Sequence, residues 1–150
     1  MELTKKLSWA YDVKTNWFRS LLRILLGAVL FYAGLAHLTF RRLEFTAQVP
    51  DWVPLSTDLV VVLSGIVEII LGMALILLPK WKALTGWIVA IFFVLIFPGN
   101  IAQYVNQTDA FGLDTDQARF IRLFFQPVLV AWALWSTRAI SAYRKKKNYS

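Results

Sequence analysis

The sequence predicts an all-α membrane protein, an antiparallel bundle of four transmembrane helices with an interfacial outer loop after the first helix. Hydrophobic residues make up 58% of the 150 residues, and the mean hydropathy is +0.56. Soluble domains are about 45–50% apolar. Four runs also approach the roughly 20 apolar residues that cross a bilayer as a helix. Continuous apolar runs favour helices, because only helices and closed barrels satisfy the backbone in lipid.

The four spans follow one another with short connections. They are expected at 20–40, 57–78, 83–104 and 119–137. The first is too long for the apolar core of a cleaved signal peptide, so we expect it to stay in the protein. Pro98 and Pro127 lie inside the third and fourth spans, where they predict kinks. Residues 20–138 would form the transmembrane domain, between an interfacial N-terminal segment, 1–19, and a basic tail, 139–150.

The connection 43–56 is too apolar for a solvated loop. It contains Phe45 and Trp52, while Pro50 and Pro54 forbid one long helix. One interpretation is a loop that lies flat on the outer interface. The other is a lid over a cavity.

The charges predict an orientation. Lys and Arg gather in the N-terminal flank, which includes Lys5 and Lys6, in the turn 79–82 and in the tail, whereas most Asp and Glu fall in the other connections. The positive-inside rule then puts both termini in the cytoplasm. The net charge of +7 comes from these flanks, and no nucleic-acid recognition motif is present. Zero cysteines and one histidine argue against a metal site of the usual kind.

One acidic side chain, Glu68, falls near the middle of the second span. A carboxylate in the bilayer core is costly unless a neighbour pairs with it, a proton neutralises it or water reaches it. The other strongly polar side chains within the spans fall toward the outer ends. They are His37, Asn100, Gln103, Arg122 and Gln126. We therefore expect one shared polar pocket that opens toward the outer face.

Each of these residues has two interpretations. Glu68 is a proton carrier or ligand contact, or else a structural ion-pair partner of Arg122 or a protonated donor to Gln126. His37 exchanges protons near neutral pH, or it is structural. Asn100 and Gln126 contact a ligand, or they join helices. Arg122 is expected to be the counter-ion of the site.

The chain resembles the DoxX-like membrane proteins over about residues 20–138. The similar segments are Gly34-Leu35-Ala36-His37-Leu38, Val49 to Pro54, Ser64 to Ile69 with Gly72, Phe97 to Ile101, and Arg122 to Pro127. The family commonly has Ala in place of Gly99 and often has Pro before the glutamine at 126 rather than after it. The resemblance implies a four-helix membrane protein. Some relatives are subunits of thiosulfate:quinone oxidoreductases or belong to membrane redox complexes; others have no assigned activity, and the wider superfamily includes membrane-protein assembly factors.

The residues and the resemblance together predict an accessory subunit or small enzyme of membrane redox metabolism in the bacterial plasma membrane. It would bind a quinone-like or other small amphipathic molecule. Glu68 and His37 would exchange protons with it. Its polar head would contact Arg122, Asn100, Gln126 and Gln103, and its apolar part Phe97 and Phe124. Electrons would come from the ligand or a redox partner protein. The alternative is a non-enzymatic binding, transport or assembly protein whose polar cluster is structural.

Overall fold

The computed structural model describes residues 7–148, so Lys5, Lys6 and the ends of the predicted N-terminal segment and tail lie outside it. The prediction of an all-α protein is confirmed, because the described residues form helices and no β-strand. The helices are α2 (Trp17–Leu38), α3 (Arg42–Thr46), α4 (Thr57–Leu77), α5 (Lys82–Val105), α6 (Asp116–Ser136) and α7 (Ala139–Asn148), with 3-10 turns η1 (Ser8–Ala10) and η2 (Pro79–Trp81).

Four of these helices are long and apolar enough to cross a membrane. Three of them, α2, α4 and α6, begin at side chains that accept a hydrogen bond from the first turn, namely Asn16, Ser56 and Thr115. The predicted spans agree with the helices to within about three residues at each end. Pro98 and Pro127 do not end their helices, since α5 and α6 both continue through them.

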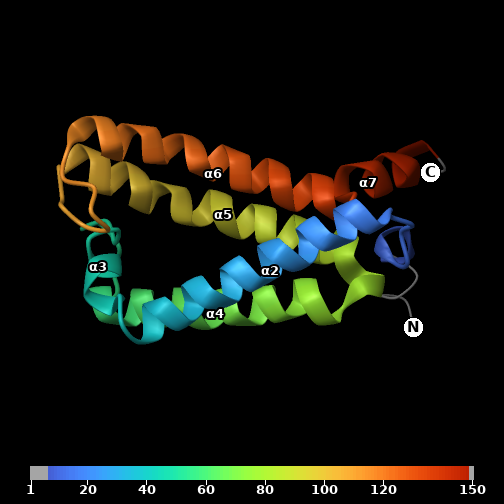
Figure 1. Cartoon of the computed structure of the whole chain (residues 1–150), viewed down its shortest axis with the longest axis horizontal. Helices are drawn as coiled ribbons and strands as arrows, with labels where there is room; N and C mark the ends of the chain where they lie inside the picture. The colour runs from blue at the N-terminus through green and yellow to red at the C-terminus, as the bar shows by residue number, and fades with distance from the viewer. Residues whose placement is uncertain (1–6, 149–150) are drawn as a thin grey trace.

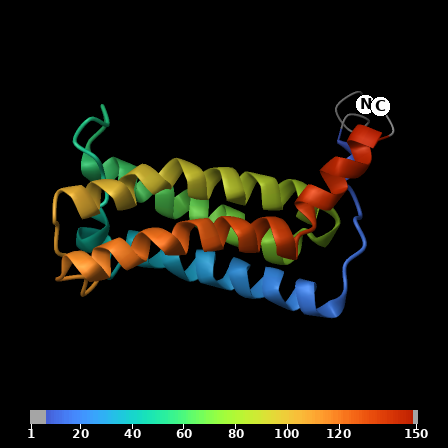
Figure 2. The ribbon, with the colours of Figure 1, turned by 90° about the horizontal axis from the view of Figure 1, so that it is seen from above.

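The chain passes back and forth along the longest axis of the molecule (Figure 1). Both ends of the chain lie at one end, which we call the α7 end, and α3 lies at the opposite end, the α3 end (Figures 1 and 2). The four long helices form two pairs, because α2 packs chiefly against α4 and α5 chiefly against α6. Contacts between the two pairs are sparser.

Glycines bring α2 and α4 into backbone contact at two levels. A Cβ atom at Gly27 would lie 2.8 Å from the carbonyl oxygen of Gly72, and one at Gly34 would lie 2.6 Å from that of Gly65. Gly27 and Gly34 are seven residues apart in α2, and Gly65 and Gly72 are seven residues apart in α4. The two glycines of each helix therefore fall on one face. Small residues permit such close approach between membrane helices. This seam fixes the register of α2 against α4.

The apolar core fills the half of the bundle toward the α7 end. It is formed by Leu26, Leu30, Leu71, Leu75, Val89, Ala90, Phe93 and Ala133, which come from all four long helices. At the α7 end, Ala10 packs with Ala83 and Ala142. The described part of the predicted basic tail therefore forms a helix, α7, which packs against the segment that precedes α2.

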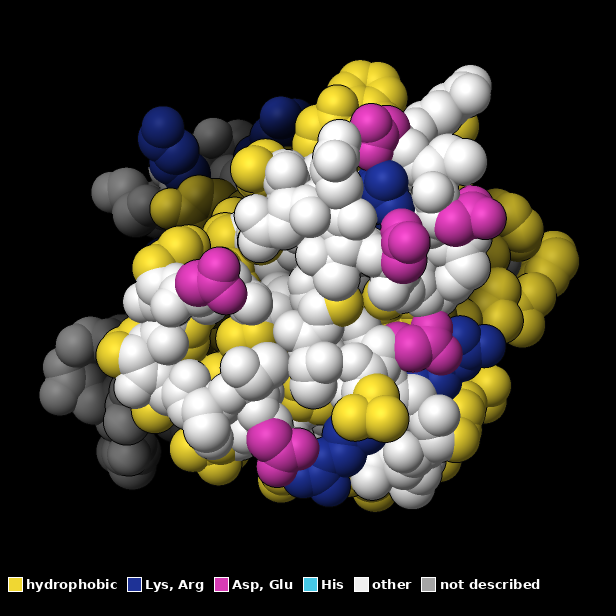
Figure 3. Space-filling view, turned by 90° about the vertical axis from the view of Figure 1, so that its left-hand side faces the viewer, with side chains coloured by type: hydrophobic (Ala, Val, Ile, Leu, Met, Phe, Trp, Pro, Cys, Tyr) yellow, Lys and Arg dark blue, Asp and Glu magenta, His cyan; other side chains and the backbone are white. Residues whose placement is uncertain are grey.

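Short polar contacts hold α3 in place at the opposite end. Arg42 donates two hydrogen bonds to Asp58 at the start of α4, at 2.7 and 2.6 Å, and this contact raises the pKa of Arg42. Glu44 accepts a hydrogen bond from the backbone N–H of Phe111 at 2.6 Å. Asp and Glu side chains are scattered over this end, several beside Lys or Arg (Figure 3). The connection thus joins both helix pairs.

Candidate functional site

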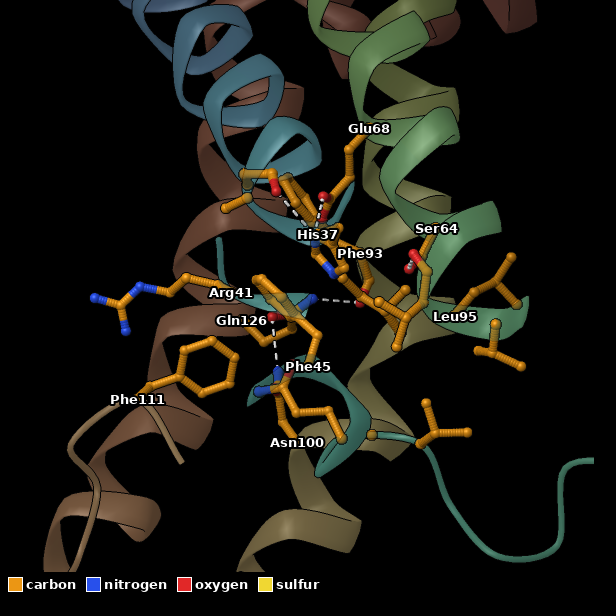
Figure 4. A pocket seen from close by; sticks show the side chains of 18 of the residues that line it. His37, Arg41, Phe45, Ser64, Glu68, Phe93, Leu95, Asn100, Phe111 and Gln126 are labelled. Carbon is orange, nitrogen blue, oxygen red and sulfur yellow. Dashed lines mark hydrogen bonds and ion pairs between the residues drawn. The ribbon is translucent and has the colours of Figure 1, made fainter. Parts of the chain in front are cut away.

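The centre of the site is a contact between His37 of α2 and Glu68 of α4. The His37 Nδ1 atom lies 2.8 Å from Glu68 Oε2, and both side chains are buried. The seam places them there, because Gly65 lies against the Cβ position of His37 and Glu68 is three residues further along α4. Figure 4 shows the two side chains directed at each other from neighbouring helices.

One nitrogen of His37 faces two acceptors. Nδ1 also lies 2.9 Å from the carbonyl oxygen of Ala33, and the direction of its N–H matches that carbonyl. Glu68 Oε2 then has no aligned hydrogen-bond donor, although it is close to the ring. An imidazole nitrogen carries at most one hydrogen, whereas a protonated carboxyl group can donate to it. The pair therefore has two arrangements of a proton: on Nδ1 facing Ala33, or on Glu68 facing Nδ1.

Beside this pair, four amide side chains form a continuous chain of hydrogen bonds. Gln48 donates to Asn100 at 3.1 Å and to Gln103 at 3.0 Å. Asn100 donates to Gln126 at 3.0 Å, and Gln126 donates to the carbonyl oxygen of Phe93 at 2.6 Å. Gln103 continues the chain to the Thr108 carbonyl at 3.3 Å. The chain joins α5, α6 and the segment after α3.

The segment after α3 reaches this network because Gly99 has no side chain. A Cβ atom there would collide with the backbone carbonyl of Gln48. Gly99 thus has a structural reason in this chain: the absence of a side chain there lets Gln48 approach α5.

These polar groups line a cavity of about 460 Å³ between the two helix pairs, in the half toward the α3 end. Its polar lining includes His37, Glu68, Asn100, Arg122 and Gln126, and most of its other lining residues are apolar. It reaches the surface of the protein, because Trp52 and Leu95 line it and are 73% and 71% exposed. Ligand pockets of about 300–1,000 Å³ are typical, usually apolar with a few placed polar groups.

Aromatic rings cover the cavity at the α3 end. Phe45 of α3 stacks on the His37 ring, with centroids 3.3 Å apart, and meets the edge of Phe111 at 4.7 Å. The guanidinium group of Arg122 lies 4.6 Å from the centre of the Phe111 ring. Stacking with Phe45 holds the imidazole flat against α3. The His37–Glu68 pair therefore lies beneath an aromatic layer.

Most of the predicted site residues are brought together, with three corrections. The expected ion pair of Glu68 with Arg122 is wrong, since the ion-pair partner of Glu68 among the described residues is His37. Phe97 does not line the cavity and faces a different one along α6. Phe124 is 60% exposed and meets Phe120 instead.

Gln103 belongs to the amide chain without lining the cavity. The sequence interpretation missed Gln48 and Phe45, which belong to the connection rather than to a span. Their signal was the apolar character of the connection, which left both a flat interfacial loop and a lid open and did not indicate which side chains turn inward. Arg23 was also missed: it lies within the predicted first span, and the structure buries it within α2.

Comparison with known proteins gives one match. A family model described as a domain of unknown function (DUF8561) matches residues 26–137. No curated protein and no solved structure matches the chain. The matched residues include all four long helices in large part, together with the whole of the cavity lining described above.

Proposed function

Because this chain belongs to the DUF8561 family, whose function is unknown, we propose its function from the site: an integral membrane protein that binds a small amphipathic molecule and exchanges a proton with its polar head. His37 and Glu68 hold and move the proton. Asn100, Gln126 and Arg122 bind the head. The apolar lining takes the rest of the molecule.

The cavity is the observation that carries this proposal. It gathers one carboxyl group, one imidazole and two amides from four helices into a space of about 460 Å³. It also reaches the side of α5 at Leu95, a surface that would face lipid. An amphipathic molecule can therefore enter from the bilayer, tail outward and head inward. Proton exchange requires groups within hydrogen-bond reach, and His37 Nδ1 lies 2.8 Å from Glu68 Oε2.

The ligand class that fits best is a quinone-like molecule, whose carbonyl oxygens accept hydrogen bonds from amides and accept protons when the ring is reduced. The resemblance to DoxX-like proteins supports this choice. The chain has no cysteine, and its described residues include no group of three or more His, Cys, Asp and Glu side chains suited to a metal. The electrons would come from a redox partner protein, which makes the chain an accessory subunit or a small enzyme of membrane redox metabolism.

In the membrane, we place the four long helices as an antiparallel bundle in the bacterial plasma membrane. The α7 end faces the cytoplasm, because Lys and Arg are more numerous there than at the α3 end. The cavity then lies in the outer half of the bilayer, and the connection that contains α3 lies at the outer interface as its lid. The rings of Phe45 and Trp52 support this position, since both line the cavity.

The test is the variant Glu68→Gln in purified protein, with a short-chain benzoquinone as the probe. Trp52 lines the cavity, so a bound quinone should quench part of the tryptophan fluorescence. We expect the variant to bind the probe at least about tenfold more weakly and to lose the pH dependence of binding. Asp114→Asn is the matched control, because it also converts a carboxylate to an amide but lies exposed and outside the cavity. Equal binding by both variants would refute the proposal.

One observation favours a second candidate, a binding or assembly protein whose cluster is structural. Each of the four amide side chains in the chain already makes hydrogen bonds to other groups of the protein. In that case Glu68→Gln should lower the unfolding temperature strongly, and the probe should not bind the unmodified protein. A stable variant of a probe-binding protein excludes this candidate.

A further inference from the structure

A second cavity runs along α6 toward the α7 end, apart from the His37–Glu68 pair. Its volume is about 760 Å³. Its sides are apolar side chains of α5 and α6, namely Val94, Phe97, Val130, Ala131 and Leu134. Its end at α7 is lined by Arg19, Arg138 and Arg144. The cavity is therefore a groove with an apolar length and a cationic end.

The groove has the length of one membrane leaflet. It follows α6 from Gln126 to Trp135, nine residue steps that rise about 14 Å in a helix. Half of a bilayer hydrocarbon core is about 15 Å thick. A fatty acyl chain in one leaflet would thus lie along the apolar side chains while its headgroup reached the arginines.

The three arginines are free to bind an anion. None of them has a carboxylate within ion-pair distance among the described residues. Arg138 donates to the carbonyl oxygen of Lys14 at 3.1 Å through Nη1, but its Nε is buried without a partner. Arg19 lies 4.7 Å from the centre of the Trp135 ring, which leaves the edge of its guanidinium group open. Guanidinium groups bind phosphate with paired hydrogen bonds.

We propose that this groove binds an anionic glycerophospholipid, with its phosphodiester against Arg19, Arg138 and Arg144 and an acyl chain along α6. Charge complementarity and the leaflet-length apolar lining select this occupant. A basic α7 end also fits the cytoplasmic leaflet, where anionic lipids attract Lys and Arg near the surface. The groove shares Gln126 with the cavity of the His37–Glu68 pair, but its arginines lie outside that cavity, and the proposal does not rest on the function proposed above.

The test is lipid titration of the full-length protein in detergent, followed by native mass spectrometry. The probes are short-chain phosphatidylglycerol, short-chain phosphatidylcholine and inorganic phosphate. We expect phosphatidylglycerol to bind most tightly and phosphate not to compete at millimolar concentration. Arg138→Gln with Arg144→Gln should weaken phosphatidylglycerol binding about 30-fold, as expected for two arginines near an anionic headgroup.

Two further variants separate charge from shape. Lys14→Gln with Lys145→Gln removes the same charge outside the groove and should leave binding within about twofold of the unmodified protein. Ala131→Trp fills the groove without changing charge and should weaken lipid binding while size exclusion shows a folded protein. Equal binding of the two phospholipids, equal loss in both double variants, or displacement of the lipid by phosphate would overturn the proposal.

Discussion

Replacing Gly34 with alanine should destabilise the protein and separate His37 from Glu68. The new Cβ atom would lie 2.6 Å from the carbonyl oxygen of Gly65 and 2.9 Å from the backbone nitrogen of Ile69. The first distance is about 0.8 Å short of the 3.4 Å at which ordinary contact begins, and the neighbour is backbone, so α4 must move away. Overpacking of this size costs about 1–3 kcal/mol. The 2.8 Å contact of His37 with Glu68 should lengthen with it.

The assay is unfolding in mixed micelles of mild detergent and SDS, followed by far-UV circular dichroism, together with binding of the benzoquinone probe. Gly27→Ala is the comparison, because its Cβ would lie 2.8 Å from the carbonyl oxygen of Gly72 but about 10 Å closer to the α7 end. It should cost similar stability and leave probe binding closer to normal. Ala28→Val adds bulk on the exposed face of α2 and should change neither. Unfolding of Gly34→Ala at the SDS fraction of the unmodified protein would refute the reasoning.

Four other changes have defined outcomes. Gln48→Leu removes the donor to two amide oxygens and should lower the free energy of unfolding by about 1–3 kcal/mol, measured by the same SDS titration. Gly99→Ala should reproduce much of that loss, because it displaces Gln48, and a double variant should lose little more than either single one. Arg23→Met should raise the unfolding temperature, since two of the nitrogen atoms of Arg23 are buried without partners; a decrease would show that the charge is satisfied in the membrane. Asp58→Asn, which breaks an exposed pair with Arg42, should leave the unfolding temperature unchanged within about one degree.

The helices were predictable because their signal is local. Each long helix is a continuous apolar run, and the bilayer leaves such a run few alternatives to a helix. The gathering of His37, Glu68, Asn100 and Gln126 was predictable for a related reason. Their positions along the spans put them at similar depths, and buried polar groups in a membrane protein tend to face one another.

The partners of these groups were not predictable from depth alone. Arg122 and His37 were expected at similar depths in the membrane. His37 is the partner of Glu68 because the glycine seam sets the rotation of α2 against α4. Gln48 escaped prediction because it lies outside the spans, and its inward position depends on the absence of a side chain at Gly99. Phe124 was misplaced because an apolar residue in a membrane helix faces lipid as readily as it faces a cavity.

The four helices pack unequally, and this determines which of them can move apart most easily. The backbones of α2 and α4 are in contact at two levels, so these two helices should move together as one rigid unit. The extensive interface between α5 and α6 makes them a second rigid unit. An opening of the cavity to admit a ligand would then occur at the sparser interface between the two helix pairs. The short helix α3 bridges this interface: Arg42 bonds to Asp58 of the first pair, and Glu44 bonds to Phe111 in the connection of the second. These two polar contacts would therefore control how easily the two pairs separate.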